Sequence, residues 1–311
     1  MPVFVISPSA PALNSSTRSM RDSGRILNIH STDLVDVISD IRQFREWRST
    51  LNQSTSVALV PTMGALHEGH ASLIRDAAST ATETVVSIFV NRIQFNDAAD
   101  YAKYPKTLDA DLEIAAAAGS TVVFVPKEEE IGPLLEGAPM RAGAIGTLWE
   151  GADRPGHFDG VLTVVNQLFS IVQPSRARFG EKDRQQLTII TQWARKAWSG
   201  LVIDHGPTVR DEDGLALSSR NRRLSPSGRK EALSINRSLR AIATLHGSGN
   251  NAVGALLDHG RSLLSPKLDV HYLAIVDSET LNPIDEARFG SIVLIAASVD
   301  GVRLLDNLEL S

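Results

Sequence analysis

The 311-residue sequence predicts an α/β fold, in which a parallel sheet covered by helices is followed by a smaller α+β domain. One observation is a strand–helix alternation: apolar runs lie at 57 to 60, 84 to 90 and 121 to 125, separated by alanine-rich helical stretches at 70 to 80 and 107 to 118. Another is that this strand–helix alternation changes after about Thr208. The chain is long enough for two such cores. We therefore expect domains at 26 to 208 and 209 to 311.

The N-terminal region divides into two parts. Residues 1 to 25 are rich in Ser, Pro and Arg, with Asp22 as their only acid, which is typical of a disordered tail. An over-called start upstream of Met20 and a cleaved transit segment are the alternatives. From Thr32 to Trp47 apolar residues recur every three or four positions, which predicts the first helix.

The pattern of strands and helices continues after a break. Residues 126 to 157 are rich in Gly and Pro, and we expect the acidic stretch Glu128 to Glu130 to be a solvated loop. Beyond them the sequence predicts helices at 159 to 172 and 183 to 198, with strands near 176 to 180 and 201 to 204. The first domain is therefore expected to be a Rossmann-like, mononucleotide-binding sheet.

The C-terminal domain begins with helices and ends with strands. Ser225 before Pro226 is a helix-start signal, and apolar residues continue the helix to Ile242. A second helix is expected around 252 to 264. The segments HYLAIVD, IVLIAASV and VRLLDNLEL predict three strands.

Composition limits the classes of function. There is no cysteine, so disulfides, thiolate nucleophiles and Cys-ligated zinc are excluded. A net charge of −5 argues against nucleic acid as a partner, and no apolar run approaches the roughly 20 residues that cross a membrane. We expect a soluble, cytoplasmic protein whose anionic ligands bind in a local positive pocket.

The segment PTMGALHEGH carries the strongest chemical signal. A buried strand runs through Pro61 and Gly64 into a helix that begins near His67. His67 and His70 are three residues apart and share a helix face, next to N–H groups that attract phosphate. The spacing is not that of zinc proteases, and the chain has neither a P-loop nor a GxGxxG motif. The histidines could instead merely cap the helix. We favour hydrogen bonding to a polyphosphate and to leaving pyrophosphate.

Other polar groups follow later elements. The amides of Asn91 and Gln94 follow a strand and suit the hydroxyl and carboxylate of an acid substrate. The charge of Lys182 is suited to binding phosphate, and the Asp183 carboxylate could bind a ribose hydroxyl or magnesium. Gln186 lies one helical turn from Lys182. Ser218, Ser219 and Arg220 can wrap a triphosphate. Arg154 and His157 are second-tier candidates that add positive charge.

Five motifs in order give the chain a family resemblance: PTMGALHEGH, FVNRIQF, RPGHFDGVLTVV, FGEKDRQQL and LALSSRNRRLS. The first resembles the HxGH signature of the nucleotidylyltransferase superfamily, in the form found in pantothenate synthetases, the pantoate–β-alanine ligases. The resemblance implies that ATP activates pantoate as pantoyl adenylate, with release of pyrophosphate. The amine of β-alanine then displaces AMP to give pantothenate. It also implies magnesium and a homodimer.

The resemblance assigns roles to individual residues. It implies catalytic roles for His67, His70, Lys182 and Arg220, and substrate contacts for Asn91, Gln94 and Gln186. It implies ATP contacts at Met63, Gly64, His67, His70, Gly180, Glu181, Lys182, Asp183, Val209, Leu217, Ser218, Ser219 and Arg220. Leu217, where the family often has Met, should pack on adenine.

The sequence departs from the family pattern at two positions, and alternatives remain. Arg92 stands where the family usually has Pro, and Arg184 where it usually has an aromatic residue; both add charge near the site. Other possibilities are an adenylyltransferase that transfers AMP onto a phosphate, a class I tRNA synthetase, and a nucleotide-binding regulatory module without turnover. The acidic chain shows no RNA-binding region, and the intact motif residues argue against the regulatory module.

Overall fold

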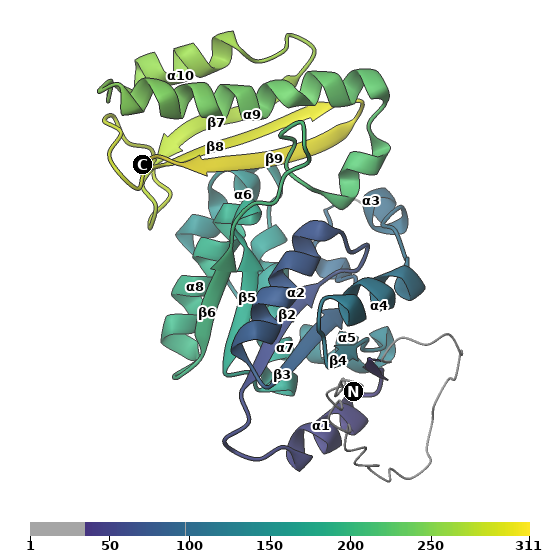
Figure 1. Cartoon of the computed structure of the whole chain (residues 1–311). Helices are drawn as coiled ribbons and strands as arrows, with labels where there is room; N and C mark the ends of the chain where they lie inside the picture. The colour runs from purple at the N-terminus through teal and green to yellow at the C-terminus, as the bar shows by residue number, and fades with distance from the viewer. Residues whose placement is uncertain (1–34, 97) are drawn as a thin grey trace, which may run out of the picture. The chain divides into compact units, whose positions relative to one another are not determined.

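The computed structural model describes residues 35 to 96 and 98 to 311, which belong to one compact unit (Figure 1). The predicted tail, residues 1 to 25, lies outside the described residues. Six parallel strands form the first sheet in the order β1-β4-β3-β2-β5-β6. Their bounds are β1 Asp36–Ile38, β2 Val57–Thr62, β3 Glu83–Ile88, β4 Val122–Phe124, β5 Arg176–Gly180 and β6 Val202–Gly206. The predicted α/β class is confirmed.

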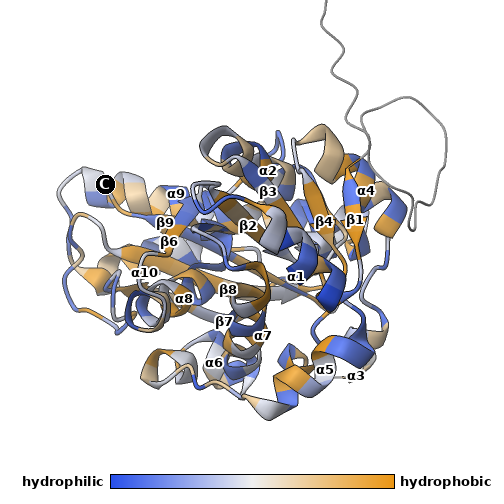
Figure 2. Cartoon of the chain, turned by 90° about the horizontal axis from the view of Figure 1, so that it is seen from below, coloured by the Kyte–Doolittle hydropathy of each residue, from blue (hydrophilic) through white to orange (hydrophobic). Residues whose placement is uncertain are grey.

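Helices cover both faces of this sheet, because its strands are apolar on both sides. Val57 and Leu59 of β2 belong to one core, and Ala58 and Val60 belong to the other. The first core includes residues of α1 Ile41–Thr50, α5 Glu128–Gly137, α7 His157–Val172 and α8 Arg184–Ala197, and the second those of α2 Glu68–Thr80 and α4 Leu108–Ala117. Figure 2 shows hydrophobic residues along the sheet strands between these helices.

The start of the sheet corrects a prediction. The helix expected from Thr32 begins only at Ile41, and Asp36–Ile38 form β1, which pairs in parallel with β4. Ile38 is buried at the edge of the first core, and the Asp40 carboxylate accepts a hydrogen bond from the N–H of Gln43. This capping bond fixes the helix start shortly after β1 ends. Two apolar residues were too few to reveal a strand.

The segment 126 to 157 is also more ordered than predicted. Glu128 to Glu130, expected in a solvated loop, form the first turn of α5, where negative charge is favourable. The Glu130 carboxylate accepts a hydrogen bond from the N–H of Ile41 at 2.8 Å, so it caps the start of α1. The short helix α6 Glu150–Asp153 follows. The acidic run is therefore helical: Glu128 and Glu129 are exposed as expected, and Glu130 caps a neighbouring helix.

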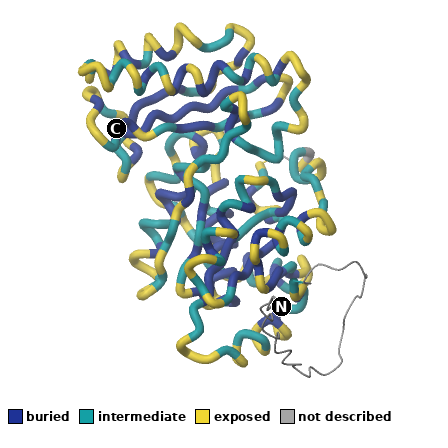
Figure 3. Tube along the Cα trace, in the orientation of Figure 1, coloured by how far each residue is buried: buried dark blue, intermediate teal, exposed yellow. Residues whose placement is uncertain are grey.

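The C-terminal elements agree with the prediction. Strands β7 Asp269–Val276, β8 Ile292–Val299 and β9 Val302–Glu309 form an antiparallel sheet. Helices α9 Pro226–Gly247 and α10 Val253–Ser262 lie together on it, and Figure 3 shows their outer surfaces exposed above buried strands. The Ser225 hydroxyl accepts from the Gly228 N–H and caps α9. The boundary near 208 stays a prediction.

The strand order locates a site. From the central strand β2 the chain moves to β3 and β4 on one side, and later to β5 and β6 on the other. In open parallel sheets ligands bind where the order reverses, at the carboxyl ends of the strands. Helix α2 follows β2, and the Lys182 segment follows β5, so the two are neighbours. No helix in the described ranges is long and apolar enough to cross a membrane.

Candidate active site

A cavity of about 230 Å³ lies at this reversal point. It brings together nearly all of the residues singled out from sequence, from both the parallel sheet and the C-terminal part of the chain. Its lining includes Met63, His67, His70, Asn91, Gln94, Gly180, Lys182, Asp183, Gln186, Val209, Leu217, Ser218, Ser219 and Arg220. Gly64 and Glu181 do not line it. Glu181 instead forms a hydrogen bond with His205.

His67 and His70 form a reciprocal cap at the start of α2. The Nδ1 atom of His67 accepts from the N–H of Gly69 at 3.2 Å, and the Nδ1 atom of His70 accepts from the N–H of His67 at 3.3 Å. Their ring centroids are 4.2 Å apart. A neutral imidazole that accepts at Nδ1 carries its proton at Nε2. Each ring therefore caps the helix and carries an Nε2–H donor, so capping does not rule out the predicted contact with phosphate, which stays a prediction.

Burial keeps both rings neutral at pH 7. Burial lowers the pKa of His67 to about 4, and the neighbouring Lys182 charge acts in the same direction. Burial and then His67 lower the pKa of His70 to about 3. An anionic phosphate in the cavity would favour the charged form and raise both pKa values. The two imidazole rings can therefore respond to a bound anion by a change in their pKa values.

Asp111, which the sequence did not single out, holds the turn before His67. Its buried carboxylate on α4 accepts from the N–H groups of Ala65 at 3.0 Å and Leu66 at 2.7 Å. Gly64 has φ +79°, and a Cβ there would lie 2.9 Å from Asp111 Oδ2. Gly64 is therefore required by the backbone turn. No local signal identified Asp111, because its partners are over forty residues away.

The amides of Asn91 and Gln94, which follow β3, line one side of the cavity. The Nδ2 group of Asn91 donates to Gln94 Oε1 and to the carbonyl of Gly160, both at 3.0 Å. Its buried Oδ1 atom has no hydrogen-bond partner among the described residues. Gln94 donates from Nε2 to Met63 Sδ. An unsatisfied acceptor beside a second amide suits a substrate hydroxyl.

An apolar wall faces these amides and was also missed from sequence. It consists of Phe89, Val161, Val164, Val165 and Leu168. The last four belong to α7, whose buried face continues from the core into the cavity. Such a wall can take a branched aliphatic group, while the amides hold its polar end. The sequence predicted only a strand at 84 to 90 and a helix at 159 to 172 here, and the fold shows that these residues line the cavity.

Lys182 and Asp183 are positioned from two directions. Their side chains form an ion pair with Nζ 3.4 Å from Oδ1. Loss of solvation raises the pKa of Asp183, but Lys182 and Arg220 outweigh it and hold the pKa below its usual value. Asn307 of β9 donates from Nδ2 to the carbonyls of Glu181 at 2.9 Å and Lys182 at 2.8 Å. The C-terminal strand thus fixes the lysine segment.

The loop that carries Arg220 is anchored at its base. Ser218 accepts from the N–H of Arg220, whose guanidinium lies 3.6 Å from the Asp100 carboxylate. Arg210 forms two hydrogen bonds with the buried carboxylate of Asp306, at 2.6 and 2.8 Å. Two hydroxyls and a guanidinium thus line the cavity, at Ser218, Ser219 and Arg220.

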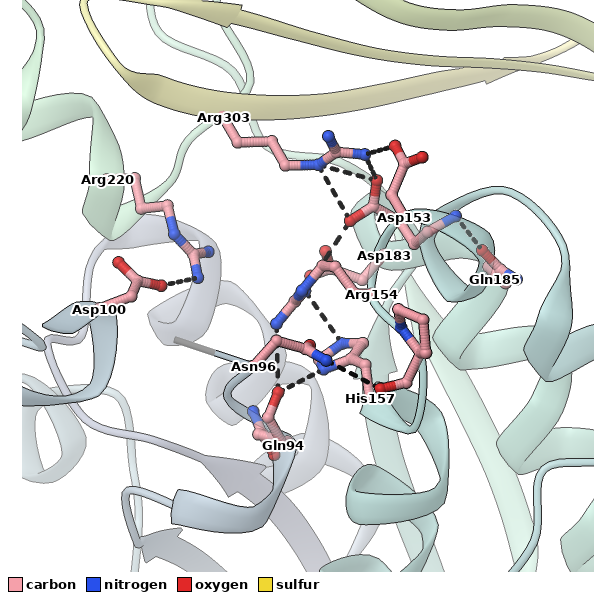
Figure 4. Close-up of polar contacts among 12 residues, drawn as sticks. Gln94, Asn96, Asp100, Asp153, Arg154, His157, Asp183, Gln185, Arg220 and Arg303 are labelled. Carbon is pink, nitrogen blue, oxygen red and sulfur yellow. Dashed lines mark hydrogen bonds and ion pairs between the residues drawn. The ribbon is translucent and has the colours of Figure 1, made fainter. Parts of the chain in front are cut away.

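A second cavity of about 120 Å³ adjoins the first and contains the second-tier candidates. Arg154 donates to the carbonyl of Gln94 at 3.2 Å, and its Nη1 is 3.2 Å from His157 Nε2 (Figure 4). Burial and the Arg154 charge lower the pKa of His157 to about 4. Arg184 also lines this cavity and pairs with Glu309 at 3.2 Å. Arg92, by contrast, is exposed and lines neither cavity.

The described residues contain no group of three or more His, Asp or Glu side chains that could hold a metal by themselves. The Asp183 carboxylate in the cavity is ionised and partly exposed. Magnesium usually binds through one or two carboxylates together with phosphates and water. The residues present therefore fit a metal that arrives with a nucleotide, and do not fit a resident metal centre.

Comparisons with known proteins place the chain in one family. The family model described as pantoate-beta-alanine ligase matches residues 36 to 309. The pantothenate synthetase of Pelobacter propionicus is 40% identical over 279 residues, which cover 89% of this chain and 98% of that protein. That of Thermus thermophilus is 44% identical over 257 residues, which cover 81% and 92%.

Two solved structures share the fold. A crystal structure of the Thermus thermophilus pantothenate synthetase has a TM-score of 0.84 at 41% identity, covering 89% of this chain and 99% of that one. The Francisella tularensis pantoate-beta-alanine ligase, in complex with beta-gamma ATP and β-alanine, has a TM-score of 0.74 at 33% identity, covering 88% and 97%. With the family model matching nearly the whole described chain, this protein belongs to the pantoate-beta-alanine ligase family.

Proposed function

We propose that this enzyme joins pantoate to β-alanine with the consumption of ATP, through pantoyl adenylate, and releases AMP and pyrophosphate. The observation that carries the proposal is one cavity that holds the His67–His70 pair, Lys182 and Arg220 beside the amides of Asn91 and Gln94. Phosphate donors and an acid-substrate pocket thus meet at one point. The membership of the family and the ATP and β-alanine in the Francisella structure support the same reaction.

The first step is adenylate formation. The pantoate carboxylate attacks the α-phosphorus of ATP, the bond to the β-phosphate oxygen breaks, and pyrophosphate leaves. The Nε2–H groups of His67 and His70 donate to the phosphates, and Lys182 and Arg220 supply positive charge. Gln94 and Gln186 hold pantoate against the apolar wall of α7, which positions its carboxylate for attack.

The second step uses the amine. Its nitrogen attacks the acyl carbon of the adenylate, the bond from carbon to the phosphate oxygen breaks, AMP leaves and the amine loses a proton to solvent. The protein supplies no covalent nucleophile. Its contribution is to hold the adenylate and exclude water until β-alanine arrives.

Three finer points belong to the proposal. The Asp183 carboxylate would hold a magnesium ion that arrives with the triphosphate, and that ion would supply positive charge to the phosphates. The enzyme acts in the cytoplasm, where ATP is supplied. It forms a homodimer, a point that rests on family resemblance and is tested by the molar mass in solution.

The test separates the two half-reactions. Purified protein with ATP, magnesium and pantoate should release pyrophosphate but little AMP until β-alanine is added. AMP release should then follow the amount of β-alanine. AMP formation that ignores β-alanine, or pyrophosphate release that does not require pantoate, would contradict the substrate assignment and favour another adenylyltransferase.

A further inference from the structure

Asn91 presents one free hydrogen-bond acceptor at the wall of the large cavity. Its Nδ2 group is committed to Gln94 Oε1 and to the carbonyl of Gly160, both at 3.0 Å. The residue is only 1% exposed, and its Oδ1 atom has no partner among the described residues. A buried acceptor without a donor is unfavourable, so a ligand that supplies a donor at this point gains affinity.

The turn that carries this amide is packed tightly against the first turn of α7. A Cβ atom on Gly160 would lie 2.7 Å from the carbonyl oxygen of Ile93 and 3.0 Å from the Cα atom of Gln94. The hydrogen bond from Asn91 to the Gly160 carbonyl ties the side chain to the same helix. The apolar wall of the cavity begins at the next residue, Val161. The Oδ1 atom of Asn91 is therefore a fixed acceptor beside that wall.

The chemistry of pantoate determines which of its groups can use this acceptor. An ionised carboxylate only accepts hydrogen bonds, so the donor must be one of the two hydroxyls. One hydroxyl is on the carbon next to the carboxylate and stays close to the reacting centre. The other is terminal and lies beyond the carbon that carries two methyl groups. Since Asn91 adjoins the wall that suits those methyl groups, the terminal hydroxyl is the group that reaches Oδ1.

The same hydroxyl threatens the adenylate once the acid is activated. Its oxygen can attack its own acyl carbon; the bond from that carbon to the phosphate oxygen breaks, AMP leaves with the electron pair, and the hydroxyl proton goes to solvent. The product is the five-membered lactone of pantoate, and the two methyl groups favour ring closure. Internal nucleophiles reach effective concentrations of roughly 10⁵ M, whereas substrates act at about 1 mM or below. The hydroxyl therefore competes with the amine unless the protein holds it away.

We infer that Asn91 and the apolar wall of α7 protect the bound adenylate from closing on itself. The Oδ1 atom accepts a hydrogen bond from the terminal hydroxyl while the wall holds the methyl groups, so the acyl chain stays extended and the hydroxyl points away from the acyl carbon. The inference rests on the proposed function. It assigns to these residues control over the fate of the intermediate, in addition to the binding of the acid.

Asn91→Ala tests the protection in a reaction with ATP, magnesium and pantoate but without β-alanine. Wild-type enzyme should form adenylate and keep it. In the variant, the release of AMP per adenylate formed should be at least about tenfold faster, as expected for the loss of a hydrogen bond, with an equal amount of lactone detected by mass spectrometry. An adenylate as long-lived as in wild type overturns the inference. AMP released together with pantoate also overturns it, because water would then be the nucleophile that Asn91 excludes.

A substrate analogue tests the contact itself. 2-Hydroxy-3,3-dimethylbutanoate lacks the terminal hydroxyl and cannot form the lactone. With wild-type enzyme its KM should exceed that of pantoate at least about 30-fold, because the Asn91 acceptor stays unpaired. In Asn91→Ala the two KM values should differ by less than about threefold. If the difference is as large in the variant as in wild type, another residue binds the hydroxyl and the inference fails.

A pair of valines on α7 tests the wall separately. Val165 is 4% exposed and lines the cavity, whereas Val172, seven residues later, is fully buried and does not line it. Val165→Ala gives the methyl groups room to turn and should speed lactone release at least about fivefold, while adenylate formation changes by less than about threefold. Val172→Ala is the matched control and should keep the wild-type lifetime of the adenylate.

The valine pair also decides the outcome if Asn91→Ala forms no adenylate. A wild-type lifetime of the adenylate in Val165→Ala would then overturn the inference, and faster lactone release confined to Val165→Ala would support it. Failure of the proposed function would look different, because wild-type enzyme would show no pantoate-dependent release of pyrophosphate.

Discussion

His70 combines two roles in one ring, and they can be separated by substitution. His70→Ala should slow adenylate formation at least about 100-fold, because a donor to the phosphates is lost. It should also cost about 1 kcal/mol of stability, since its Nδ1 atom caps the His67 N–H. His70→Gln can restore the cap and should recover the stability without recovering the rate. Pyrophosphate release and urea unfolding measure the two effects. A His70→Ala enzyme with near-normal pyrophosphate release would refute the role.

Asp111 supports the turn before His67 through hydrogen bonds from the backbone N–H groups of Ala65 and Leu66. In Asp111→Asn one carboxylate oxygen becomes an NH₂ group that faces a backbone N–H of Ala65 or Leu66. We expect a loss of about 2 kcal/mol in the free energy of unfolding, as for a hydrogen bond to a charged group. Adenylate formation should also fall about tenfold, because His67 follows this turn. Asp109→Asn, an exposed change on the same helix, is the control and should alter neither quantity. Equal behaviour of the two variants would show that the turn needs no such support.

Elements were predictable where the pattern is local and long. The runs at 57 to 60 and 84 to 90 became β2 and β3, and the Ser225–Pro226 signal became the start of α9. Strand β1 was not predicted because only two of its three residues are apolar. Helix α5 was not predicted because it contains Gly132 and Pro133, and these residue types ordinarily indicate a break in a helix.

The position of His67 and His70 at the start of α2 was predictable for the same reason, because strand–glycine–histidine–helix is a local sequence. Contacts between distant segments were not predictable. Asp111 and Asn307 produce no signal in the periodicity, and the apolar wall of α7 has the pattern of ordinary core. Their partners lie far along the chain, up to 126 residues away for Asn307 and Glu181. Only the topology brings these residues to the cavity.

Strand β9 illustrates how a distant element supports the Lys182 segment. Asn307→Ala removes both hydrogen bonds to the carbonyls of Glu181 and Lys182. We expect the KM for ATP to rise about tenfold, as the lysine loses its fixed position, with an unchanged circular dichroism spectrum. Asn282→Ala, at an exposed position, serves as the matched control. An unchanged KM for ATP in Asn307→Ala would mean that the segment holds its own conformation.

The whole molecule should lose stability in two separate stages as the pH falls from neutral to below 4. The first comes from buried histidines: burial lowers the pKa of His157 to about 4, as it does for His67, while the unfolded chain has a pKa near 6.5. Below pH 6.5 the unfolded state therefore binds protons that the folded state does not, and stability falls until about pH 4. The second stage lies lower. Hydrogen bonds, first from the Thr280 backbone, lower the pKa of Asp277 to about 2, so its stabilisation is lost only below about pH 4.

Urea unfolding at pH 7.5 and pH 5.0 isolates the first stage. Wild-type protein should lose about 2 kcal/mol for a well-buried histidine such as His157, which is 8% exposed. His157→Gln keeps an amide that can donate to the Gln94 carbonyl but cannot titrate, so its loss between the two pH values should be smaller by about that amount. His259→Gln, on the last turn of α10, is the control for an added glutamine and should keep the wild-type pH dependence. An equal pH dependence of His157→Gln and wild type would show that His157 is protonated in the folded protein, and the cavity would then carry a second positive charge beside Arg154.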